Sequence, residues 1–142
     1  MAIHYKHDNI PTICPALPGG AKLIAFMQSV FDAKVQNRYD AGPDMVAHAE
    51  IRLGDSVVMT GDPMGDHVLT PGAVACYVPE VDATYKKALE AGAESKEEPK
   101  NQFYGDRSAR VVDPFGNTWS IATRVEELTK EEIDKRMAAM SG

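Results

Sequence analysis

A histidine and a glutamate spaced to share one strand face are the first candidates for chemistry in this sequence. His48 and Glu50 lie in the segment 45–53, where apolar residues alternate with mostly polar ones, the period-two pattern of a half-buried β-strand. Side chains two residues apart project from the same face, so these two are expected to point together. An imidazole beside a carboxylate can act as an acid–base pair or supply two ligands to a divalent metal. A structural ion pair on a solvated face is the alternative.

A group of basic and aromatic residues provides the second set of candidates. Arg107, Arg110 and Arg124 could together favour an anionic ligand, because guanidinium groups offer forked donors; ordinary surface arginines are the alternative. Tyr104 and Ser120 lie near these arginines in sequence and are further ligand-binding candidates. Asp106 is interpreted as a local turn or strand-edge partner, and Trp119 as core, because Trp119 shares a strand face with Ile121.

The elements that must position these residues follow from periodicity and turn chemistry. Segment 103–112 and segment 118–123 each alternate apolar and polar residues, and Asp113-Pro114-Phe115-Gly116-Asn117 between them is typical of a tight turn. On the strand of His48, the apolar alternate residues are expected to pack on a helix: Met45, Ala47, Ala49, Ile51 and Leu53. Further strands are predicted at 12–17, 35–39, 56–60, 73–78 and 94–99, and helices at 21–31, 82–91 and about 127–140.

The order strand, helix, three strands occurs twice, separated by a loop at 61–72 that is rich in Gly, Pro and Asp. An internal repeat of this kind predicts two βαβββ modules, at about 10–62 and 73–124, in a single domain spanning 1–142. Thr129 and Glu132 have the spacing of a capping box for the last helix. That helix is expected either to lie on its own domain or to contact a partner subunit.

Composition excludes several classes of function. The net charge is −6 and no basic stripe is present, which argues against nucleic-acid binding. No apolar run reaches the roughly 20 residues that span a bilayer, so no membrane partner and a cytoplasmic location are expected. Cys14 and Cys76 have no metal-type spacing and are interpreted as reduced thiols, Cys14 being a weak candidate for a reactive one.

In combination, the motifs resemble the glyoxalase/bleomycin-resistance/dioxygenase superfamily, also called vicinal oxygen chelate proteins, and within it the PhnB-like branch. The resemblance extends from about Thr12 to Met140. It depends on the following stretches: His48-Ala49-Glu50, Gly54-Asp55-Ser56, Val81-Asp82-Ala83-Thr84-Tyr85, Glu90-Ala91-Gly92-Ala93, Tyr104-Gly105-Asp106-Arg107 and the segment from Asp113 to Thr123.

The resemblance implies an α+β fold in which two βαβββ modules form a curved, cup-like mixed sheet, followed by a C-terminal helix, in a homodimer. Metal-using members place His or Glu ligands on the first and last strands of each module. The equivalent positions here are Cys14, Val58, Ala73 and Ser120. The usual metal site is therefore expected to be absent, and Arg124 stands where PhnB-like chains often carry a histidine.

Three functions are compatible with this picture. The first is a binding protein that holds a small, aromatic or anionic molecule in the cup, as resistance-type members do, without a metal. The second is a lyase or dioxygenase that uses a divalent metal held by His48 and Glu50 with other groups, in which the metal acts as a Lewis acid. The third is acid–base catalysis by His48 and Glu50 without a metal.

Overall fold

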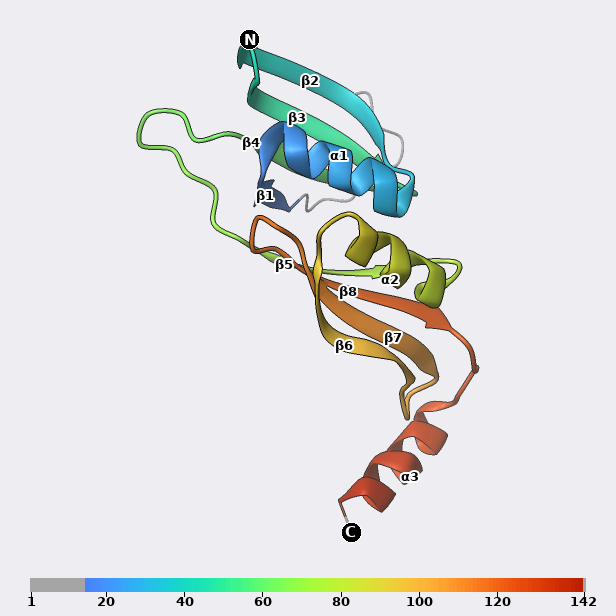
Figure 1. Cartoon of the computed structure of the whole chain (residues 1–142). Helices are drawn as coiled ribbons and strands as arrows, with labels where there is room; N and C mark the ends of the chain where they lie inside the picture. The colour runs from blue at the N-terminus through green and yellow to red at the C-terminus, as the bar shows by residue number, and fades with distance from the viewer. Residues whose placement is uncertain (1–14, 142) are drawn as a thin grey trace. The chain divides into compact units, whose positions relative to one another are not determined.

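The computed structural model describes residues 15–141, which form two compact units, one ending at Gly72 and one beginning at Ala73 (Figure 1). Each unit contains a strand, a helix and three more strands in chain order, as the internal repeat predicted. The fold is therefore α+β with two four-stranded mixed sheets. The prediction of a single domain with one shared cup stays a prediction.

The first unit comprises β1 (Ala16–Pro18), α1 (Gly20–Phe31), β2 (Lys34–Gly42), β3 (Met45–Leu53) and β4 (Ser56–Gly61). Its sheet has the order β1-β4-β3-β2, with β1 parallel to β4 and the other pairs antiparallel. The predicted strand at 12–17 lies partly outside the described residues, and β1 is its described part.

Helix α1 forms because its apolar residues recur at helical spacing and bury one stripe against β3 and β4. Leu23 and Met27 are fully buried in that stripe. The chain enters the helix at Gly20, which has a positive φ of 50° and donates its backbone N–H to Thr60 Oγ1 at 3.1 Å. The positive φ favours glycine, and a Cβ there would also overlap with the Asp62 carboxylate unless that side chain shifted.

The prediction for the faces of β3 is correct at its centre and wrong at its start. Ala49 and Ile51 are fully buried, as expected. Met45, however, is 41% exposed because it begins the strand beside the turn, whereas Val46 is fully buried. The segment after β4 covers this position: the backbone N–H of Asp62 donates to Val46 O, and the Val46 N–H donates to Asp62 Oδ2, both at 2.7 Å.

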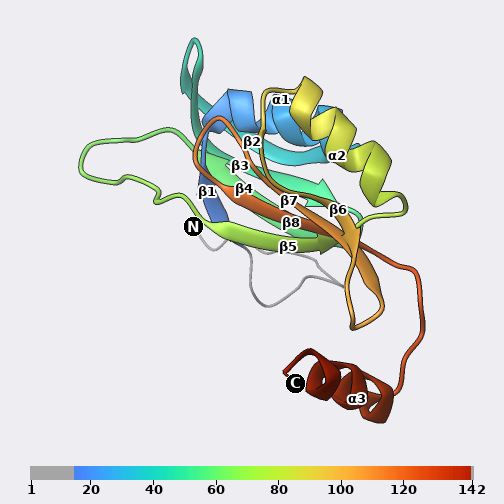
Figure 2. The same cartoon turned by 60° about the horizontal axis from the view of Figure 1, so that its bottom comes forward.

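The second unit comprises β5 (Ala73–Tyr77), α2 (Val81–Glu90), β6 (Glu94–Asn101), β7 (Asp106–Val112), β8 (Thr118–Arg124) and α3 (Lys130–Met140). Its sheet has the order β5-β8-β7-β6, which repeats the topology of the first unit. Helix α2 packs on one face of β6, β7 and β8 (Figure 2). Trp119 and Ile121 of β8 are fully buried, which confirms the interpretation of Trp119 as core.

The turn between β7 and β8 is organised by one buried carboxylate. Asp113 Oδ1 accepts hydrogen bonds from the backbone N–H groups of Phe115 (2.8 Å) and Asn117 (3.0 Å). Asp113 Oδ2 accepts from Asn117 Nδ2 and Trp119 Nε1, both at 2.9 Å. The Asp-Pro-Phe-Gly-Asn stretch therefore builds the hairpin and ties it to the core tryptophan.

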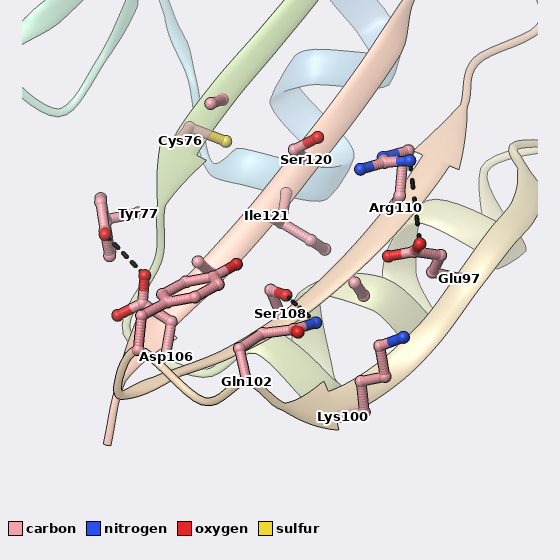
Figure 3. Close-up of a pocket in the computed structure, with 14 residues that line it drawn as sticks. Cys76, Tyr77, Glu97, Lys100, Gln102, Asp106, Ser108, Arg110, Ser120 and Ile121 are labelled. Atoms are coloured by element: carbon pink, nitrogen blue, oxygen red, sulfur yellow. Dashed lines mark hydrogen bonds and ion pairs between the residues drawn. The ribbon is translucent and has the colours of Figure 1, made fainter. Parts of the chain in front are cut away.

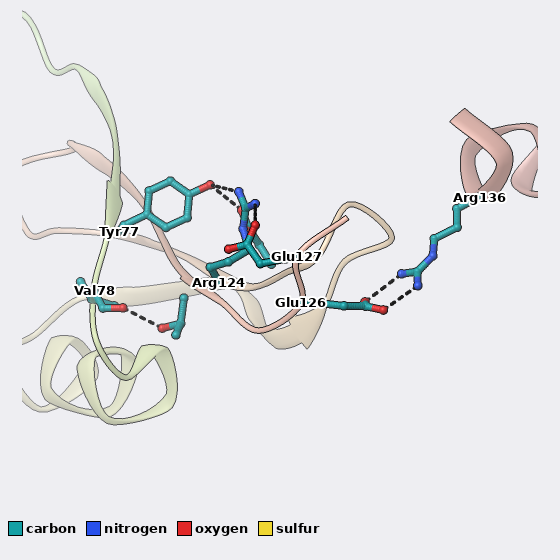
Figure 4. Close-up of polar contacts among 8 residues, drawn as sticks. Tyr77, Val78, Arg124, Glu126, Glu127 and Arg136 are labelled. Atoms are coloured by element: carbon teal, nitrogen blue, oxygen red, sulfur yellow. Dashed lines mark hydrogen bonds and ion pairs between the residues drawn. The ribbon is translucent and has the colours of Figure 1, made fainter. Parts of the chain in front are cut away.

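Helix α3 begins at Lys130 rather than near 127, because Thr129 is the N-cap. The predicted capping box is confirmed: the Glu132 N–H donates to Thr129 Oγ1 at 3.2 Å, and the Thr129 N–H donates to Glu132 Oε2 at 2.7 Å. Glu126 lies before the helix and pairs instead with Arg136, whose Nη2 donates to Glu126 Oε1 at 2.6 Å (Figure 4). Among residues 15–141, no helix is long and apolar enough to cross a membrane.

Candidate functional site

A pocket of about 450 Å³ lies on the sheet of the second unit (Figure 3). All four strands of the sheet contribute to it, together with residues 102 and 104 between β6 and β7. Its volume falls within the range of small-molecule sites. Its lining includes the polar side chains Tyr77, Glu97, Lys100, Gln102, Tyr104, Asp106, Ser108, Arg110 and Ser120.

At one end of the pocket, Asp106 is buried and both of its carboxylate oxygens have partners. Tyr77 donates its hydroxyl hydrogen to Asp106 Oδ2 at 2.7 Å, and Arg124 Nε donates to Asp106 Oδ1 at 2.5 Å. Arg124 Nη2 also donates to the Tyr77 hydroxyl at 3.3 Å, visible in Figure 4. The hydrogen bonds to Tyr77 and then to Asp106 raise the pKa of Arg124. This trio is a fixed, charge-compensated end wall.

The remainder of the pocket has polar groups that keep hydrogen-bonding capacity for a ligand. Arg110 Nη1 lies 3.8 Å from Glu97 Oε1, longer than a hydrogen bond. Gln102 Nε2 donates to Ser108 Oγ at 3.0 Å, which leaves the serine hydroxyl hydrogen free to donate. Within residues 15–141, no carboxylate lies within ion-pair distance of Lys100.

Arg107 does not line this pocket, because it projects from the face of β7 opposite to that of its neighbour Ser108. Its Nε and Nη2 donate to the two oxygens of Asp82 at 2.7 and 2.8 Å, a bidentate pair that links β7 to α2. The hydrogen bond from Arg107 lowers the pKa of Asp82. Arg107 therefore already has an acidic partner within its own unit.

In the first unit, His48 and Glu50 lie together as the sequence predicted. Glu50 is 2% exposed, and its Oε2 accepts from Asn37 Nδ2 at 2.7 Å and Gln36 Nε2 at 3.2 Å. His48 Nε2 lies 3.4 Å from Glu50 Oε1, and the Tyr39 ring stacks beside the imidazole. The carboxylate can orient the imidazole through one ring nitrogen, which leaves the other nitrogen to exchange a proton.

Apart from Arg107, which pairs with Asp82, the sequence-predicted candidates fall into two places. Tyr104, Arg110 and Ser120 line the pocket of the second unit, and Arg124 supports its wall through Asp106. His48 and Glu50 form a separate cluster in the first unit.

Sequence reasoning missed Tyr77 and Lys100. The sixth strand was predicted to end at Pro99, but β6 continues to Asn101, because an edge strand tolerates proline. Tyr77 could have been found from the period of two that it shares with Ala73 and Ala75.

On β4, the residue that shares the face of Glu50 is Met59, one position after Val58, which the family resemblance implied as the ligand position. Val58 is paired with Ile51 and buried, whereas Met59 is paired with Glu50 and shares its face. A shift of one residue in a strand reverses the face, so Met59 is the residue beside Glu50. Cys14 lies outside the described residues. Among the described ones, no three His, Cys, Asp or Glu side chains form a group suited to a metal ion.

Cys76, on β5, does not have the character of a nucleophile. Burial raises the pKa of its thiol to about 11, so the thiolate is a minor species at neutral pH. Within the described residues Cys76 is a free cysteine, and the interpretation of both cysteines as reduced thiols stays a prediction.

A family model and a curated relative both match this chain over most of its length. The model described as "Glyoxalase/Bleomycin resistance protein/Dioxygenase superfamily" matches residues 18–121. The "Uncharacterized protein Mb0911c" of Mycobacterium bovis is 31% identical, over 98% of this chain and 97% of that protein.

Solved structures show the same fold. TioX from Micromonospora sp. ML1 superposes with a TM-score of 0.65 at 20% identity, over 80% of this chain and 98% of that one. A glyoxalase-related enzyme from Fulvimarina pelagi superposes with a TM-score of 0.61 at 17% identity, over 84% of this chain and 88% of that one. At these identities the likeness concerns the fold alone.

Proposed function

This chain belongs to the Glyoxalase/Bleomycin resistance protein/Dioxygenase superfamily, and on that premise we propose that it binds a small molecule in the pocket of its second unit without transforming it. The observation that carries the proposal is the pocket itself, about 450 Å³ on an intact sheet, with an end wall whose charges are already compensated. A carboxylate held by a tyrosine and an arginine is a positioning device. It offers no free base for catalysis.

The finer assignments belong to the same proposal. The stretch Tyr104-Gly105-Asp106-Arg107 favours the PhnB-like branch. A homodimer is supported by α3, which has no buried residue and carries the exposed Met137 and Met140. A cytoplasmic location is supported by two cysteines without the spacing of a disulfide framework.

The test is a screen of dye-like and antibiotic-like compounds by ligand-observed NMR, repeated after treatment with a chelator. We expect compounds that bind in both conditions and are recovered unchanged by mass spectrometry. The variant Ser120→Trp, which fills the pocket from the central strand β8, should abolish binding. The control Ser56→Trp, at the exposed start of β4, should leave it intact. Turnover of a bound compound, or binding that survives Ser120→Trp, contradicts the proposal.

A second candidate function rests on the His48–Glu50 cluster. The buried Glu50 and the adjacent, 40%-exposed imidazole have the arrangement of an acid–base pair, and could also supply two ligands of a divalent metal in a lyase or dioxygenase. Metal analysis of protein purified without a histidine tag distinguishes the acid–base pair from the metal site. A metal that is present in the wild-type protein and lost from the His48→Ala variant supports the metalloenzyme. Metal content that His48→Ala leaves unchanged counts against it.

A further inference from the structure

Among residues 15–141, the pocket of the second unit has one positive charge without an acidic partner. Four of its lining side chains are acidic or basic residues that carry a full charge at neutral pH: Glu97, Lys100, Asp106 and Arg110. Asp106 is paired with Arg124, which lies outside the lining, so its charge is balanced. Glu97 can balance only one of Lys100 and Arg110, and it lies nearer to Arg110 at 3.8 Å. One cation therefore stays without a carboxylate in the described residues.

The hydrogen-bonding groups that remain available are mainly donors. Both Asp106 oxygens already accept hydrogen bonds. Ser108 and Ser120 keep hydroxyl hydrogens, and the Lys100 ammonium and the Arg110 guanidinium have donors to spare. Figure 3 shows Lys100 on β6, Arg110 on β7 and Ser120 on β8 around the same hollow. Donors from three neighbouring strands suit a ligand that is rich in acceptors.

Apolar surface lies beside these donors. Ala75 and Ala122 line the pocket without polar side-chain atoms, and the Tyr104 ring, 37% exposed, contributes an aromatic face. A ligand that combines an apolar or aromatic body with one acidic group would match both parts.

Taking small-molecule binding in this pocket as its premise, we propose that the ligand is a small organic anion, with a carboxylate, sulfonate or phosphonate received by Lys100 and an apolar body against Ala75, Ala122 and Tyr104. Lys100 is then the residue that determines charge specificity. Arg107, which is saturated by Asp82, does not contribute to it.

Two dyes of the same skeleton test the proposal. 1-Anilinonaphthalene-8-sulfonate is an anion, and N-phenyl-1-naphthylamine is its uncharged parent; both fluoresce in apolar surroundings. We expect the wild-type protein to bind the sulfonate more tightly. The variant Lys100→Met should weaken sulfonate binding about threefold to fivefold, the effect of one exposed ion pair, and leave the neutral dye unaffected. Lys100→Arg should restore much of the loss, and added salt should weaken the sulfonate only.

Matched controls separate this proposal from its premise. Lys96→Met removes the same charge from the same strand outside the pocket and should change neither dye. Ser120→Trp should remove both. If the neutral dye binds and Ser120→Trp removes it, while Lys100→Met leaves the sulfonate unchanged or weakens both dyes equally, the anion proposal is wrong and the pocket proposal stands. If neither dye binds, or Ser120→Trp affects neither, both proposals fail.

Discussion

The buried carboxylate of Asp113 should be one of the most sensitive positions in the chain. It is 3% exposed and accepts four hydrogen bonds, three of them in buried surroundings. Asp113→Ala removes all four acceptor contacts, and each buried donor that loses its acceptor costs about 1 to 3 kcal/mol. Because the turn can relax and some donors keep other contacts, we expect a loss of about 3 to 5 kcal/mol in the free energy of unfolding.

The variant Asp113→Asn keeps the size of the side chain but removes its charge and replaces one acceptor oxygen by an amide donor. One side-chain oxygen can still accept from the backbone of Phe115 and Asn117. The new amide group, however, faces Asn117 Nδ2 and Trp119 Nε1, which are also donors. We therefore expect a loss of about 2 kcal/mol or more, although the side chain keeps its size.

Urea unfolding followed by circular dichroism measures these changes. Asp55→Ala is a matched control, because Asp55 is an exposed turn residue whose carboxylate accepts a hydrogen bond from the neighbouring Ser56 hydroxyl, and it should change the unfolding free energy by less than about 0.5 kcal/mol. A double-mutant cycle of Asp113→Ala with Trp119→Phe should show a coupling of about 1 to 2 kcal/mol. A loss below about 1 kcal/mol for Asp113→Ala, or strict additivity in the cycle, would refute the reasoning.

Three further predictions concern backbone, thiol and helix. Gly105→Ala should destabilise the protein by about 2 to 4 kcal/mol in the same assay, because φ is 97° there and a Cβ would overlap with the Glu126 carbonyl oxygen; a neutral change contradicts this. Cys76 should react with iodoacetamide at pH 8 about tenfold more slowly than a free thiol, by peptide mass spectrometry in a Cys14→Ser background. Alkylation as fast as that of a free thiol would contradict this. Because burial raises the pKa of Cys76 from about 9 to about 11, the buried neutral thiol should contribute its full stability to the fold below pH 9 and lose it as the pH rises from 9 to 11. The Arg136 guanidinium lowers the pKa of Glu126. The ion pair between them, which fastens α3 to the segment before it, should therefore persist above about pH 4.5 and weaken as the pH falls below that value. Arg136→Met should return the Glu126 pKa, followed by NMR, to its ordinary value, and a pKa that stays low would show that another group lowers it.

The local elements of this chain could be predicted from its sequence because their signals are local. The stripe of Leu23 and Met27 predicts α1, the spacing of Thr129 and Glu132 predicts the cap of α3, and alternation predicts β3 with its correct bounds. The repeat of these elements then predicted two modules of the same topology, which the two sheets confirm. The contact of His48 with Glu50 followed from period two alone.

The site in the second unit was decided by tertiary structure. Arg107 and Arg110 lie three residues apart on β7, so alternation alone puts them on opposite faces, but only the folded structure shows that one face meets Asp82 on α2 and the other lines the pocket. Asp106 finds its partners 29 and 18 residues away, and no local pattern indicates which cation a carboxylate will meet at such distances. In the proposal, Lys100 matters because strand pairing brings it to a pocket in which Asp106 is paired with Arg124 and Glu97 lies nearer to Arg110. Charge compensation is a property of neighbours in space, and only the folded sheet determines those neighbours.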